Sequence, residues 1–253
     1  MSGGSLPRIS TIRLRVRDPD AQTRFYVDAL GMRERSDSTI GYGDREAGLL
    51  FEQAQTSYAP SDDDIYWKIS ISVPDIDLAH DQLRAKGVEI EKPRQVLDVA
   101  YLAHLYDPEG FDVEFLDHWF KGERPTGTLN EDLLGGGPRL NLLTLRTHDA
   151  DAAKGVATSL GMRPFYSARL PNFGFDLHFF GFGDEAPPQK DLYAIENRPW
   201  TYQRPETVLE IQHRHGAAPK RLKTDGEAGY AGAIITGAEA PNRIDELQIE
   251  ARN

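Results

Sequence analysis

Residues 9–32 read ISTIRLRVRDPDAQTRFYVDALGM, and this stretch decides the fold. From Ile12 to Val16 apolar and polar residues alternate, which is the pattern of a strand that is buried on one face. The helix that follows should begin near Asp18 and end at Gly31, because aspartate favours the first position of a helix and glycine the position after its end. The stretch therefore predicts a strand followed by an amphipathic helix.

The same plan recurs along the chain. It returns in residues 67–87, WKISISVPDIDLAHDQLRAKG, in residues 140–162, LNLLTLRTHDADAAKGVATSLGM, and more faintly in residues 231–253. Short runs of strand character follow the first three helices: Gly48–Phe51, Ala100–Tyr106, Phe111–Leu116, Asp176–Phe180 and Thr207–Gln212. The unit is therefore βαβββ, and the fold class is α+β. The fourth copy should stop after a strand and a helix.

Composition suggests where the units divide. Residues 121–138 are rich in glycine and proline, which is typical of a linker. We predict a flexible lead over residues 1–8, a first module of two complete units over 9–120, the linker over 121–138, and a second module over 139–253. The second module would hold one complete unit and one truncated unit. Its open sheet edge favours a homodimer over a closed monomer.

The charge of the chain narrows its partners. The 253 residues carry a formal net charge of −11, which disfavours nucleic acid and anionic membranes. The chain has no cysteine, so disulfides, thiolate metal sites and cysteine nucleophiles are excluded. No apolar run approaches the ~20 residues of a membrane span, and the first residues do not resemble a signal peptide. We expect a cytoplasmic protein with a small-molecule partner.

Paired βαβββ units that open with V-x-D and F-Y-x-x-x-L-G-M resemble the vicinal oxygen chelate superfamily. This superfamily includes glyoxalase I, extradiol dioxygenases, methylmalonyl epimerases and bleomycin-resistance proteins. The resemblance rests on RFYVDALGM, VPDIDLAHDQLRAKGV and DPEGFDVEFLD, and later on FDLHFFGFGDE and VLEIQHRHG, which look most like glyoxalase I. It implies two glyoxalase-like modules, each with a cup-shaped sheet.

The resemblance also implies a divalent metal in the cup, held by His or Gln, His and Glu. The matching positions of the first module fall on Thr11, Lys68 and Glu114, and Glu210 matches the ligand glutamate in the second module. Threonine is a poor ligand, and lysine binds metals only after losing its proton. We therefore predict no resident cofactor and weak or no binding of Zn²⁺, Fe²⁺ or Mn²⁺.

Lys68 and Glu114 allow two interpretations. They could form a structural ion pair in place of the metal, or Lys68 could bind a substrate oxygen while Glu114 moves a proton. His104 precedes Glu114 by ten residues and either shuttles a proton or is a half-buried strand residue.

Strand alternation places Thr11, Arg13 and Ser70 on the cup face, where they would bind substrate. Arg13 either binds a carboxylate or pairs with Glu52 or Glu114.

A separate histidine pair lies at His213 and His215, two residues apart on one strand face. Such a pair binds zinc or copper only with further ligands, and Asp176 and His178 would join if their strand adjoined. We favour a solvated pair.

Two classes of function remain. The first is an enzyme of the lyase/isomerase or dioxygenase type that acts on a small carbonyl, diol or carboxylate compound, with Lys68, His104 and Glu114 as catalytic residues. The second is a non-catalytic binding protein of the bleomycin-resistance type. A third alternative is a metal-dependent lyase or ring-cleaving dioxygenase with unorthodox ligands. We favour an enzyme.

Overall fold

The computed structural model describes residues 6–119, 127, 129–237, 242–244 and 247–252. Most of the predicted lead and the first part of the predicted linker lie outside these residues. The first repeat comprises β1 (Arg8–Val16), α1 (Pro19–Arg24), a π-helical turn (Phe25–Ala29), β2 (Arg33–Glu34), β3 (Ile40–Gly41) and β4 (Gly48–Gln53). The second comprises β5 (Tyr66–Val73), α2 (Ile76–Ala85), β6 (Arg94–Val96), β7 (Ala100–Tyr106) and β8 (Asp112–Asp117).

The second half of the chain follows the same plan. The third repeat comprises β9 (Arg139–Thr147), α3 (Ala150–Ser159), β10 (Arg163–Leu170), β11 (Phe175–Gly181), α4 (Asn197–Tyr202) and β12 (Val208–Arg214). The fourth comprises β13 (Gly229–Thr236), β14 (Asn242–Ile244) and β15 (Ile249–Arg252). The predicted βαβββ unit is confirmed in the first three repeats.

Aspartate and glycine bound the three repeat helices as the sequence predicts. The carboxylates of Asp18, Asp75 and Asp149 accept hydrogen bonds from N–H groups of the first helical turn. Each helix is closed by a glycine in the left-handed region, where other residues are strained: φ is 77° at Gly31, 79° at Gly87 and 82° at Gly161. The chain therefore turns back toward the sheet at the same point in each repeat.

The fourth repeat differs from its prediction. The helix expected after its first strand is wrong for the described residues, because residues 242–244 and 249–252 form β14 and β15. Leu247, Ile249 and Ala251 are buried at every second position, which is the period of a strand. β15 pairs with β13, and β14 with β15.

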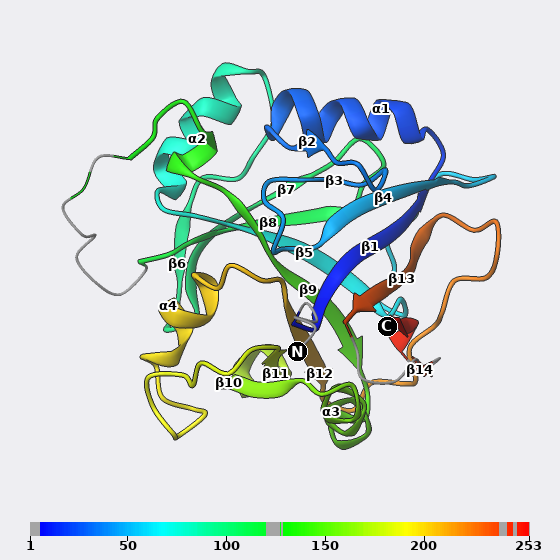
Figure 1. Cartoon of the computed structure of the whole chain (residues 1–253), viewed down its shortest axis with the longest axis vertical. Coiled ribbons are helices and arrows are strands. Elements are labelled where there is room, and N and C mark those ends of the chain that lie inside the picture. Colours follow the sequence, from blue (N-terminus) through cyan, green and yellow to red (C-terminus); the bar gives the residue numbers. More distant parts are fainter. Residues whose placement is uncertain (1–5, 120–126, 128, 238–241, 245–246, 253) are drawn as a thin grey trace, which may run out of the picture.

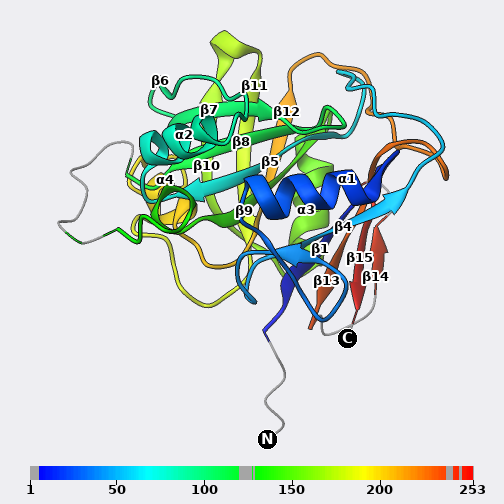
Figure 2. The ribbon, with the colours of Figure 1, turned by 90° about the horizontal axis from the view of Figure 1, so that it is seen from above.

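The repeats pair in a nested order. A seven-stranded sheet runs β14-β15-β13-β1-β4-β3-β2, and an eight-stranded sheet runs β10-β11-β12-β9-β5-β8-β7-β6. The first repeat therefore joins the fourth through β1 and β13, while the second joins the third through β5 and β9. Figure 2 shows β13, β14 and β15 beside β1 and β4.

This arrangement corrects the expectation that the first two repeats build one module. Every repeat begins with a similar alternating strand, so the pattern does not specify which other repeat it pairs with. The open edge expected of the fourth repeat is covered by β1 of the same chain. The linker expected over residues 121–138 stays a prediction. Both sheets combine strands that precede these residues with strands that follow them.

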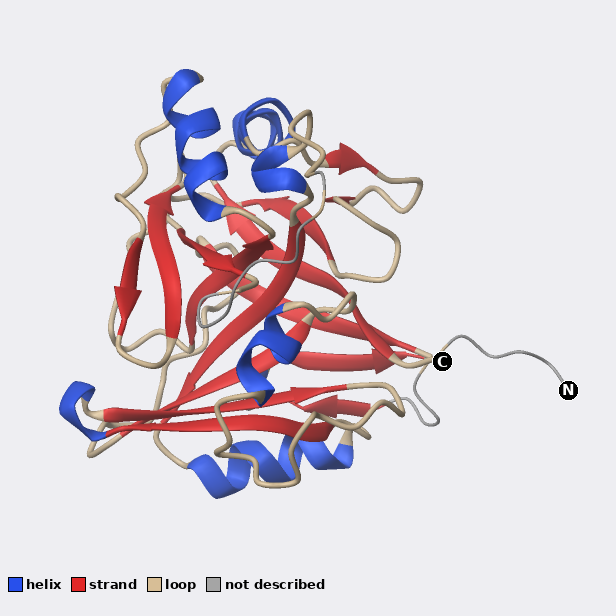
Figure 3. Ribbon diagram, turned by 90° about the vertical axis from the view of Figure 1, so that its left-hand side faces the viewer, coloured by secondary structure: helices blue, strands red, loops and turns tan. Residues whose placement is uncertain are grey.

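Three helices, α1, α2 and α3, pack outside the sheets (Figure 3). In Figure 1, α1 and α2 lie along one side of the molecule and α3 lies on the opposite side. The residues expected to face the helices are fully buried in the core: Ile12, Leu14, Val16, Ile69, Ile71 and Val73 are each 0% exposed. Among the described residues, none of the helices has the length and apolar character needed to cross a bilayer.

A buried histidine should make stability depend on pH. His118 follows β8, is 5% exposed and places Nε2 3.2 Å from Oγ of Ser72. Burial, assisted by the positive charge of Arg139, lowers the pKa of His118 to about 3. Since an unfolded histidine titrates near pH 6.5, the unfolded chain binds more protons below that pH, and acid weakens the fold.

We predict that the free energy of unfolding of the wild type falls by about 2 kcal/mol more than that of His118→Gln between pH 7 and pH 5. Urea denaturation at both pH values measures the difference. If the two proteins lost the same free energy on acidification, His118 would not be held neutral in the fold.

Candidate functional site

A row of polar side chains crosses the eight-stranded sheet. The strands β12, β9, β5, β8 and β7 are neighbours in that order. Register places Glu210 opposite Thr144, Thr144 opposite Lys68, Ser70 opposite Glu114, and Glu114 opposite His104. We call the face that carries these residues the cup. Alternation along each strand keeps them on this face while their neighbours pack in the core.

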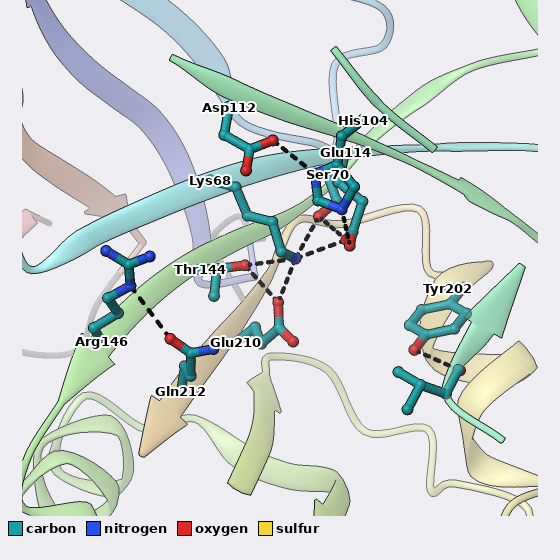
Figure 4. Close-up of polar contacts among 11 residues, drawn as sticks. Lys68, Ser70, His104, Asp112, Glu114, Thr144, Arg146, Tyr202, Glu210 and Gln212 are labelled. Carbon is teal, nitrogen blue, oxygen red and sulfur yellow. Dashed lines mark hydrogen bonds and ion pairs between the residues drawn. The ribbon is translucent and has the colours of Figure 1, made fainter. Parts of the chain in front are cut away.

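Lys68 lies at the centre of this row. Its Nζ is 2.6 Å from Oε1 of Glu114 and 3.0 Å from Oε2 of Glu210, and 3.3 Å from the hydroxyl oxygens of both Ser70 and Thr144. Figure 4 shows the ammonium group pointing between the two carboxylates. Lys68 is 2% exposed, so the pairs form away from bulk water. An ammonium group has three protons, and these four oxygens use them all.

The two carboxylates differ in their surroundings. Oε1 of Glu114 also accepts from the hydroxyl of Ser70 at 2.8 Å, and Oε2 lies 3.5 Å from Nε2 of His104. Glu210 accepts from Lys68 and Thr144 through Oε2. Among the described residues, no donor meets the other oxygen of Glu210. That oxygen is available to a ligand in the cup.

These surroundings move the pKa values of the two glutamates apart. Burial opposes charge on both residues, but attraction to Lys68 and His104 lowers the pKa of Glu114 below its usual value. Burial raises the pKa of Glu210, and repulsion from Glu114 adds to this, so the attraction of Lys68 does not offset them. One ammonium group neutralises one carboxylate. Glu114 is therefore the ionised partner and Glu210 the one that more readily holds a proton.

Neighbouring carboxylates raise the pKa values of both Lys68 and His104. Burial opposes charge on Lys68, yet attraction from Glu114 and Glu210 raises its pKa above the usual value. Burial likewise opposes charge on His104, but its 2.7 Å contact with Asp112 and the charge of Glu114 raise its pKa. The site is thus a row of acidic and basic groups that alternate from Asp112 through His104, Glu114 and Lys68 to Glu210.

An apolar cavity of about 230 Å³ lies over this row. Lys68, His104, Glu114 and Glu210 form its polar part, and Arg94 adds one cation. Its apolar lining is Trp67, Val96, Val99, Ala100, Leu102, Leu116, Leu142, Leu170, Phe173, Phe175, Leu177 and Tyr202. The volume is below the roughly 300–1,000 Å³ of sites for drug-sized ligands, so it suits a small molecule.

A larger hollow of about 880 Å³ lies beside α2 and the loop before β4. Three of its charged side chains are bonded to the protein itself. Arg33 donates to the carbonyl of Tyr42, Lys86 to two carbonyls at the end of the first helix, and Glu46 accepts from three backbone N–H groups. This hollow therefore offers less chemistry than the cup.

The structure brings together four of the six residues expected in one site. Lys68, Ser70, His104 and Glu114 meet in the cup, but Thr11 and Arg13 do not. Both lie on β1 in the seven-stranded sheet, where Nε of Arg13 is 2.6 Å from Oε1 of Glu52. The expectation of a shared site is wrong for these two residues, because it assumed that the first and second repeats pair.

Sequence reasoning also missed contributors. Glu210 was expected in a separate module, yet it faces Glu114 across Lys68. Thr144 is not among the expected residues, because a single threonine on a strand marks no motif and its place depends on the pairing of β9 with β5 and β12. Tyr202, from α4, lines the cavity and donates to the carbonyl of Val99 at 3.2 Å. Only the register of β5 against β9 reveals the first two, and no local motif marks Tyr202.

A divalent metal does not fit this set of residues. An ammonium group already occupies the space between the carboxylates, and its raised pKa keeps it charged. A metal ion there would meet a positive charge instead of a free lone pair.

Comparison with known proteins agrees with the architecture. Residues 8–115 match the family model of the Glyoxalase/Bleomycin resistance protein/Dioxygenase superfamily. This part of the chain is therefore similar to that superfamily. The chain is also 26% identical over 133 residues to a probable lactoylglutathione lyase of Vibrio parahaemolyticus, and the match covers 47% of this chain and 94% of that protein.

Two solved structures show the fold over most of the chain. Glyoxalase I from Zea mays superposes with a TM-score of 0.60 at 19% identity, covering 91% of this chain and 74% of the maize chain. A putative dioxygenase from Bacillus subtilis gives a TM-score of 0.52 at 15% identity, covering 97% and 73%. The predicted glyoxalase-like fold of repeated units in two modules is thus confirmed.

Removing the central ammonium should destabilise the fold. Lys68→Ala leaves two buried carboxylates without their cation, and breaking a buried pair costs about 3–5 kcal/mol of unfolding free energy. Lys92→Ala, at an exposed position, should change stability by no more than about 0.5 kcal/mol. Urea denaturation of the two variants at pH 7 tests this. Equal stability of both variants would show that Lys68 does not hold the carboxylates together.

Proposed function

We propose that the cup binds a small, largely apolar molecule with a carbonyl group and moves a proton on it without a divalent metal. The observation that carries this proposal is the position of Nζ of Lys68 among four oxygen atoms, including those of Glu114 and Glu210. The positive charge that a metal supplies in such a cup is here part of the chain. Such a cup would keep the acid–base groups, and Lys68 would replace the Lewis acid.

The roles follow from the two pKa directions. Pairs of groups whose pKa values are pushed apart are natural acid and base partners. Glu114, the ionised member, would take a proton from the carbon next to a carbonyl, while Glu210 would give its proton to the carbonyl oxygen. The product of this step is an enediol when the substrate is an α-hydroxy carbonyl compound.

The second half of the reaction restores both groups. Glu114 would return its proton to the former carbonyl carbon, and Glu210 would recover one from the hydroxyl group that the substrate carried at the start, which becomes the new carbonyl. The net result is an isomerisation. His104, 3.5 Å from Glu114 and bonded to Asp112, would position Glu114 and adjust its charge. Lys68 has no proton left for substrate, so its role would be to hold the two carboxylates.

The cavity limits the size of the substrate. Lactoylglutathione is a tripeptide thioester, and a space of about 230 Å³ would enclose only part of it. The apolar walls favour a compact body such as a short acyl chain or a single ring. Smaller α-hydroxy carbonyl compounds are therefore the better candidates.

A second candidate is non-catalytic binding, and one observation favours it. The polar groups of the floor bond mainly to one another, so a ligand would be held chiefly by the apolar walls. The homodimer and the cytoplasmic location stay predictions.

We expect the proton-transfer function to depend on both glutamates and on no metal. The probes are hemithioacetals of methylglyoxal with 2-mercaptoethanol and with glutathione, followed by NMR in D₂O for exchange of the α-proton. Glu114→Gln and Glu210→Gln should each lower the rate by about 10²–10⁴-fold. Glu89→Gln, at an exposed position, and treatment with a chelator should leave it unchanged.

The outcomes separate the candidates. Loss of turnover on chelation would contradict the metal-free mechanism. Thermal stabilisation of the wild type by either hemithioacetal without any exchange would favour the binding protein instead.

If Lys68 takes the place of a metal ion, removing its ammonium group should allow the cup to bind a divalent metal. Lys68→Ala leaves two carboxylates and two hydroxyl groups around a vacant centre, a set of oxygen ligands that suits Mn²⁺. We expect Mn²⁺ to raise the melting temperature of Lys68→Ala and to leave that of the wild type unchanged. Adding Glu210→Gln to Lys68→Ala should abolish the effect. Equal responses of Lys68→Ala and wild type to Mn²⁺ would contradict the replacement.

A further inference from the structure

Two histidines and an aspartate meet on the face of the eight-stranded sheet opposite the cup. Asp176 on β11 lies directly opposite His213 on β12, and His215 follows two residues later. Glu210 points into the cup, and strand alternation turns His213 to the other side. Arg214, between the two histidines, points away from them and donates to Asp62 at 2.8 Å.

The three side chains are close enough to share one ion. Each offers a ligand atom, and the three atoms lie within 4.8 Å of one another. Nε2 of His215 is 3.1 Å from Oδ2 of Asp176, and the ring centres of the two histidines are 5.3 Å apart. Ligand atoms around tetrahedral zinc lie about 3.3 Å apart. Small rotations of the two imidazoles therefore suffice to close the site.

Backbone contacts already hold two of these ligands in place. The N–H of His215 donates to the carbonyl of Gly174 at 2.9 Å, which ties the segment after β12 to the start of β11. Oδ1 of Asp176 accepts from the N–H of Leu170 at 3.4 Å, so Oδ2 is the oxygen turned toward the histidines. Outer contacts of this kind orient ligands in metal sites.

We propose that Asp176, His213 and His215 bind a zinc ion at this face, separately from the cup. Two imidazole nitrogens and one carboxylate oxygen are a ligand set that zinc favours. The site is partly exposed, so the fourth position is open to water. The ion joins the start of β11 to the segment that follows β12 and stabilises both strand ends. Among the residues that the structure describes, this is the group in which three such ligands converge.

This inference does not rest on the proposed function of the cup. The ligands lie on the opposite side of the sheet, and the two sites can be tested independently. Manganese favours oxygen ligands and probes the cup, whereas zinc favours the imidazoles.

The experiment is a calorimetric titration of the full chain with ZnCl₂ after removal of metal by a chelator. The wild type should bind one equivalent of zinc. His215→Ala and Asp176→Asn should each weaken binding at least about tenfold, since loss of even an outer contact costs roughly 10–100-fold. His80→Ala removes a histidine on α2 and should change nothing, and Glu210→Gln should leave zinc binding intact.

Circular dichroism tests whether each variant is folded. Two ligand variants are used so that the test still holds if one of them does not fold. Zinc binding by His215→Ala and Asp176→Asn at wild-type affinity would overturn the proposal, as would a wild type that takes up no zinc. Loss of zinc in Glu210→Gln would move the ion to the cup and would also overturn it.

Discussion

The ammonium group of Lys68 between Glu114 and Glu210 is the interaction on which the cup depends. Two carboxylates buried side by side repel each other and are costly to ionise. A charged lysine offsets this only when its own protons are satisfied, and the hydroxyls of Ser70 and Thr144 complete that set. The floor of the cavity is therefore polar inside and closed to solvent, beneath apolar walls.

This cluster also joins the two halves of the chain. Glu114 belongs to the second repeat and Glu210 to the third, and the pairing of β5 with β9 is what brings them together. In the sequence, the first and fourth repeats flank the second and third repeats. They build the seven-stranded sheet. In that sheet, Arg13 pairs with Glu52, and Arg15 lies 3.7 Å from the same carboxylate. These two contacts share one glutamate and do not form a row of alternating acidic and basic groups like that of the cup.

The two faces of the eight-stranded sheet have different chemistry. The cup combines a neutralised floor with apolar walls, which favours small organic molecules. The opposite face carries imidazoles and a carboxylate at the ends of β11 and β12, which favours a metal ion. Strand alternation separates the two sets, because Glu210 and His213 lie three residues apart on one strand and so point to opposite sides.

Local signals in the sequence determined the repeats. The alternating strands, the aspartates that begin the helices and the glycines that end them act through nearest neighbours, and they predict β1, β5 and β9 with the helices that follow. The same parity placed Ser70 on the cup face, and the family resemblance placed Lys68 and Glu114 at matching positions. Tertiary structure alone decided which repeats pair, and so placed Glu210 and Thr144 beside Lys68 while it took Thr11 and Arg13 away. Strand pairing over long distances depends on the packing of whole sheets, and four similar strands carry no local mark of their partners.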